Sequence, residues 1–74
     1  MNFPPQSQVE EIRLSYPADT RVELVSMDDP YTNLQPGDMG TVKLVDDTGS
    51  IHVSWDKGSS RAVVYGVDIV KIHK

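Results

Sequence analysis

Alternation of apolar and polar residues over most of the chain predicts a small all-β protein. The alternating stretches have a period of two, which is typical of strands that bury one face. They are TRVELVSM at 20–27, GTVKLV at 40–45, SIHVSW at 50–55, RAVVY at 61–65 and DIVKI at 68–72. The side chains expected to point inward are Val22, Leu24, Val42, Leu44, Ile51, Val53, Trp55, Ile72 and either Ile69 or Val70.

Turn signals between these stretches fix the expected connections. DDTGS at 46–50 and DKGSS at 56–60 predict tight hairpins, because Gly49 and Gly58 can adopt positive φ. A long connection precedes the second strand, and GVD at 66–68 predicts a short last turn. Such an arrangement favours a small five-stranded SH3-like barrel, in which closure removes most exposed sheet edges.

A helical period precedes the strands. Val9, Ile12 and Tyr16 are spaced as one face of a helix. Ser7 and Glu10 have the spacing of a capping box, and Pro17 disfavours helix beyond residue 16. Glu10 and Glu11 also suit the positive end of a helix dipole. We therefore expect a helix over 7–16.

One domain accounts for the length of the chain. Its 74 residues suffice for a small core of modest stability. We expect residues 1–6 to form a flexible lead-in and residues 7–74 to form one SH3-like domain, with the helix covering an open end of the barrel.

The stretch DDPYTNLQPGDMGTV, residues 28–42, is the long connection between the first two strands. Pro36 and Gly37 predict a type II turn. Gly40, at the start of the next strand, suggests a bulge or a close approach of the backbone. Asp28 and Asp29 can form Asx turns.

Two interpretations of Tyr31 and Leu34 in this loop remain open. Both side chains could pin the loop to the sheet as a small hydrophobic cluster. Alternatively, Tyr31 could line a shallow groove with Trp55 and Tyr65, since aromatic rings with polar tips are frequent anchors of interaction sites. The candidate partner-binding residues are Asp28, Asp29, Tyr31, Leu34, Trp55 and Tyr65.

Charge argues against direct nucleic-acid binding. The formal net charge is −4, whereas nucleic-acid binders usually carry a basic surface. Asp46, Asp47 and Asp56 are candidates for an acidic face that meets a basic protein partner.

The sequence contains little that suggests catalysis. There is no cysteine, which excludes disulfides and thiolate metal sites and fits a cytoplasmic protein. The N-terminus lacks the features of a signal peptide, and no apolar run is long enough to cross a membrane. His52 has no evident nucleophile to activate, and the aspartates lack calcium-loop spacing. We expect no enzyme activity, no cofactor and no metal.

The segment TRVELVSMDDPYTNLQPGDMGTVKLVDDTGSIHVSWDKGSS, Thr20 to Ser60, resembles a family of short uncharacterised bacterial domains. These occur in Gram-positive gut bacteria, their phages and conjugative elements. The shared pattern includes DPYTxLxPGxxGTV and VDDxGxIHVxWDxGSS, with a glycine where this chain has Asp19. The resemblance implies an SH3-like fold and assigns no function.

Three functions follow as hypotheses. The first is a non-enzymatic protein-interaction module that uses the long loop and an aromatic groove. The second is an accessory protein of a mobile element that inhibits a host nucleic-acid enzyme through its acidic face. The third is a nucleic-acid-associated module of the KOW type. The oligomeric state remains open.

Overall fold

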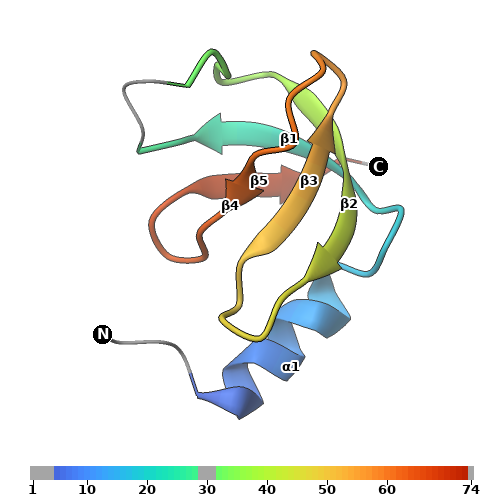
Figure 1. The fold of residues 1–74 in the computed structure, drawn as a ribbon, viewed down its shortest axis with the longest axis vertical. Coiled ribbons are helices and arrows are strands. Elements are labelled where there is room, and N and C mark those ends of the chain that lie inside the picture. The colour runs from blue at the N-terminus through green and yellow to red at the C-terminus, as the bar shows by residue number, and fades with distance from the viewer. Residues whose placement is uncertain (1–4, 29–31, 74) are drawn as a thin grey trace.

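The computed structural model, which describes residues 5–28 and 32–73, contains one helix followed by one antiparallel sheet (Figure 1). Helix α1 spans Gln6–Ser15. The strands are β1 (Arg21–Ser26), β2 (Met39–Val45), β3 (Ile51–Trp55), β4 (Ala62–Val63) and β5 (Ile69–Ile72). The expected helix and five strands are confirmed.

The sheet is open rather than closed into a barrel. Its strand order is β4-β3-β2-β1-β5, so β4 and β5 are the two edges. A turn over 64–68 carries the chain from one edge to the other, with the Val67 and Asp68 N–H groups donating to the Val64 carbonyl at 3.1 and 2.9 Å. Among the described residues, only an isolated bridge between Tyr65 and Asp68 lies in this turn. The mostly β fold class is confirmed, but the expected closure of the sheet into a barrel is not.

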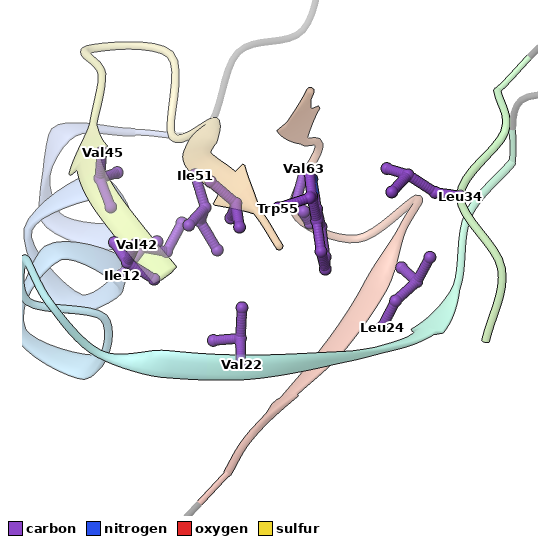
Figure 2. Packing of buried hydrophobic residues seen from close by; sticks show 10 residues of the cluster. Ile12, Val22, Leu24, Leu34, Val42, Val45, Ile51, Trp55 and Val63 are labelled. Atoms are coloured by element: carbon purple, nitrogen blue, oxygen red, sulfur yellow. The ribbon is translucent and has the colours of Figure 1, made fainter. Parts of the chain in front are cut away.

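The core lies on the concave side of the sheet (Figure 2). Every inward position expected on β1 and β3 is buried, with Trp55 at 2% exposure. Helix α1 contributes Ile12, and the first connection contributes Leu34. The cluster comprises Ile12, Val22, Leu24, Leu34, Val42, Val45, Ile51, Val53, Trp55 and Val63.

A bulge in β2 overturns one expected core position. Val42 pairs with Val53, but the next pair is Leu44 with His52, so Lys43 is an extra residue in β2. The extra residue reverses the alternation of the faces that follow it. Leu44 is therefore 53% exposed, and Val45 takes the buried place expected for it.

The edge strand β5 buries less than its sequence suggested. Val70 packs against the core, whereas Ile69 and Ile72 are 54% and 43% exposed. Because β5 is an edge strand with a neighbouring strand on one side only, fewer residues cover its side chains. The prediction that Ile72 is a core residue was wrong.

The capping box expected at the start of α1 does not form. Pro5 is the N-cap, and its carbonyl accepts from the Gln8 and Val9 N–H groups at 2.9 and 3.1 Å. The helix begins one residue early, which places Ser7 inside its first turn and Glu10 in its second. Glu10 instead contacts Arg13 at 2.7 Å.

The turns match their sequence signals. Gly49, Gly58 and Gly37 all adopt positive φ, the last at 98° in a turn closed by the Asp38 N–H and the Gln35 carbonyl. Asp19 also adopts positive φ, at 73°. Aspartate tolerates this conformation better than most residues because its short side chain can hydrogen-bond locally.

Substituting Gly40 by alanine is expected to destabilise the fold by about 1–3 kcal/mol through overpacking. A Cβ atom at this position would lie 2.5 Å from Val53 Cγ1 and 2.9 Å from Trp55 Cε3. Urea unfolding of Gly40→Ala measures the effect. Ser54→Ala, at an exposed position of the neighbouring strand, is the control. Equal stabilities of the two variants would contradict the close approach.

Candidate interaction surface at the open side of the sheet

Two neighbouring hollows lie at the open side of the sheet, the first of them against helix α1, and Tyr16 and Tyr65 line both. The first, of about 190 Å³, is lined by Gln8, Glu11, Ile12, Ser15, Tyr16 and Tyr65. The second, of about 250 Å³, is lined by Tyr16, Ile51, Val63, Tyr65, Gly66, Asp68, Ile69 and Val70. We call these residues together the Tyr16–Tyr65 surface.

The fold explains why the hollows occur here. Pro17 ends α1, which leaves the half-buried Tyr16 at the helix C-terminus beside the sheet. Because β4 and β5 do not pair along their length, the buried side chains of Ile51 and Val63 form the floor of the second hollow.

Exposed apolar side chains concentrate beside the hollows. Val64, Tyr65, Val67 and Ile69 are 46–54% exposed and lie within six consecutive residues. Single exposed apolar residues are ordinary, but a contiguous group is typical of interaction surfaces. This group therefore marks the surface as a candidate binding site.

Carboxylates are the charged groups of the surface. Glu11 lines the first hollow and Asp68 the second, and neither lining contains lysine or arginine. Asp68 accepts hydrogen bonds from the Asp28 and Val64 N–H groups at 2.9 and 3.0 Å, which fixes its position. Burial raises the pKa of Tyr16, and the nearby Tyr65 raises it further.

Trp55 and Tyr65 do not form the expected common groove. Trp55 is buried in the core, and its Nε1–H donates to the Arg61 carbonyl at 3.0 Å, which ties down the segment before β4. Tyr65 is 49% exposed on the Tyr16–Tyr65 surface. Tyr31 and Asp29 lie outside the described residues.

The described part of the first connection is anchored to the sheet. Leu34 is buried in the core beside Leu24 (Figure 2). The Gly37 N–H donates to the Leu24 carbonyl, and the Leu24 N–H donates to the Asp38 carbonyl, both at 2.8 Å. Asp38 also pairs with Lys57 at 2.8 Å. For Leu34, the structure supports the first interpretation, in which the side chain pins the loop.

The three aspartates of the expected acidic face are not together. Asp46 and Asp47 follow β2, whereas Asp56 follows β3, so they lie at opposite ends of β3 (Figure 1). Asp47 contacts Arg13 at 2.7 Å, and Asp56 binds Arg21 through both carboxylate oxygens. Asp46 lies 2.8 Å from the Nε2 atom of His52.

Across residues 5–28 and 32–73, no three histidine or acidic side chains are grouped so as to bind a metal ion. Helix α1 is 10 residues long, and no helix in this part of the chain is long and apolar enough to span a membrane.

The fold and the surface define a small antiparallel β domain with an apolar hollow at its open side. The chain belongs to the family described as Domain of unknown function (DUF4314), whose model matches residues 5–73. The expected membership of an uncharacterised family of short domains is thereby confirmed. Neither the curated proteins nor the solved structures contain a match to this chain.

Sequence reasoning identified Tyr65 but missed Tyr16, Glu11 and Asp68. Tyr16 carried a partial signal, because a tyrosine combines an apolar ring with a polar hydroxyl and is frequent at interfaces. Nothing in the sequence places helix α1 beside the 64–68 turn, so the pairing of Tyr16 with Tyr65 depends on tertiary structure.

Fluorescence of Trp55, the only tryptophan, tests its assignment to the core. A ring that is 2% exposed should emit at short wavelength and be quenched weakly by acrylamide. Unfolding in guanidinium provides the reference for full access. If acrylamide quenched the native protein as strongly as the unfolded chain, Trp55 would be exposed and its assignment to the core would be wrong.

The Asp46 carboxylate is expected to contribute acid-sensitive stability. Hydrogen bonds from the Thr48 hydroxyl and the His52 ring, with the Ser50 and Thr48 N–H groups, lower its pKa well below 3.8. A lowered pKa adds stability above the unfolded-state value, and this contribution is lost as the pH falls through the folded-state value.

Asp46→Ala should therefore cost about 1 kcal/mol at neutral pH, a value reduced by partial solvent exposure of the carboxylate. Its unfolding free energy should fall less steeply than that of the wild type below pH 3.8. Chemical denaturation across the acid range measures both effects. The neighbouring Asp47→Ala, with a side chain that is 90% exposed, is the matched control. Parallel pH profiles for Asp46→Ala and the wild type would refute the assignment.

Proposed function

We propose that this domain is a non-enzymatic protein-interaction module that binds a segment of a partner protein at the Tyr16–Tyr65 surface. The observation that carries the proposal is the exposed apolar group at 64–69 beside two hollows that share two tyrosines. Such a surface offers an apolar pocket with polar tips at its rim, which is the usual composition of interaction hot spots.

The long β1–β2 connection remains part of this proposal as a flank of the site. The Asp28 N–H donates to the Asp68 carboxylate, so the start of the loop lies against the second hollow. Of the residues expected to bind the partner, Tyr65 lies on this surface and Asp28 contacts it. Leu34 and Trp55 serve the site indirectly, because they pack the core beneath the sheet.

We also propose that the fold is an SH3-like barrel whose sheet remains open between its edge strands β4 and β5. The central place of β2, between β1 and β3, supports this interpretation. The bulge in β2 also supports it, because bulges bend a strand and let one sheet curve around a core. The absence of cysteine supports a reducing compartment, and we place the domain in the cytoplasm.

The alternative functions have less support. An inhibitor that presents Asp46, Asp47 and Asp56 together would need those carboxylates on one face, and they lie at opposite ends of β3. A nucleic-acid module would need cations at its binding surface, and the charged side chains of the Tyr16–Tyr65 surface are Glu11 and Asp68.

Selection from a phage-displayed library of random linear peptides tests the module. Immobilised wild-type protein should enrich peptides whose affinity falls about tenfold or more in Tyr65→Ala, because Tyr65 is the exposed aromatic anchor. Fluorescence anisotropy of a labelled, enriched peptide gives the affinities, and thermal unfolding confirms that each variant is folded.

Leu14→Ala is the matched control for this experiment. Leu14 is an apolar helix residue, 82% exposed, and lines neither hollow, so its removal should leave peptide affinity unchanged. Failure to enrich any peptide, or peptides that bind Tyr65→Ala as well as wild type, would count against the proposed function.

A further inference from the structure

We infer that the partner segment carries a lysine or arginine next to an apolar side chain. This inference rests on the proposed function and specifies the chemistry of its partner. The apolar side chain enters the second hollow, and the cation extends past the tyrosine pair into the first hollow, toward Glu11. The partner is a peptide segment of another protein.

Glu11 differs from most other carboxylates of the protein. The carboxylates of Glu10, Glu23, Asp38, Asp46, Asp47 and Asp56 each lie within 3.7 Å of a basic nitrogen. Glu11, by contrast, makes no ion pair or side-chain hydrogen bond with the other described residues. Its exposed side chain lines the first hollow, so its charge remains available to a partner.

The two hollows differ in chemistry, which sets the order of groups in the ligand. Ile51, Val63 and Val70 line the second hollow and favour an aliphatic side chain. Gln8, Glu11 and Ser15 give the first hollow a polar lining that favours a charged one. Tyr16 and Tyr65 line both, where an aromatic face attracts a passing cation.

The same charges disfavour other occupants. Glu11 and Asp68 would repel the phosphates of a nucleic acid. A second copy of this chain could pair through the free edge of β5, but Lys71 lies on that strand, 3.7 Å from Glu23. Lysine on an edge strand is a common guard against edge-to-edge pairing. A basic and apolar peptide segment fits the surface best.

The peptides enriched on wild-type protein test this inference directly. Those that depend on Tyr65 should share a lysine or arginine beside an aliphatic residue. With one such peptide as the probe, Glu11→Gln should weaken binding about twofold to fivefold, as is usual for an exposed ion pair. Asp47→Asn, which removes one negative charge outside both hollows, should leave the affinity unchanged.

A double-mutant cycle separates the specific contact from a general effect of charge. Replacing the peptide cation by alanine should weaken binding to wild type and have little further effect in Glu11→Gln. Charge reversal in Glu11→Lys should weaken binding more than Glu11→Gln. Equal losses in Glu11→Gln and Asp47→Asn would overturn the inference.

The outcomes distinguish the inference from the proposed function. Peptides that require Tyr65 but carry no cation would leave the interaction module in place and refute the basic partner. Absence of any Tyr65-dependent peptide would refute both. A dimer in analytical ultracentrifugation that Tyr65→Ala dissociates would assign the surface to a second copy of the chain, and would also overturn the basic segment.

Discussion

The close packing of Trp55 and Val53 over Gly40 is the contact on which the rest of the structure depends. Gly40 pairs with Val22 of β1 on one side and with Trp55 of β3 on the other, so it lies where both halves of the sheet meet. Its missing side chain lets the Trp55 ring lie against the β2 backbone. The indole N–H then anchors the Arg61 carbonyl, which positions β4 at one edge of the sheet.

The two edges produced by this arrangement create the candidate site. A turn over 64–68 joins β4 to β5 without strand pairing along their length, and its apolar side chains project to solvent. The Asp68 carboxylate stabilises the turn by accepting a hydrogen bond from the Val64 N–H group. It also accepts one from the Asp28 N–H group, which links the turn to the first connection. The surface is therefore built on hydrogen-bonded backbone, which limits the ordering cost of binding a partner.

Among the described residues, some charged side chains form ion pairs and others do not. Arg13, Arg21 and Lys57 each contact an aspartate from a distant part of the chain, and these contacts brace the hairpins and the helix. Exposed ion pairs of this kind contribute little stability individually. Their consequence is that the excess negative charge is left to residues such as Glu11, which lines the first hollow of the Tyr16–Tyr65 surface.

The sequence by itself determined the elements, because a period of two, a helical period and glycine-based turns act over a few residues. Pro17 fixed the end of the helix in this way, and Gly37 and Gly58 fixed their turns. Only the tertiary structure decided that Lys43 is an extra residue in β2, because a bulge depends on the partner strand. It also decided that Trp55 is core while Tyr16 and Tyr65 share a surface. Burial of an aromatic ring depends on contacts between segments far apart in the chain, and local patterns do not encode these contacts.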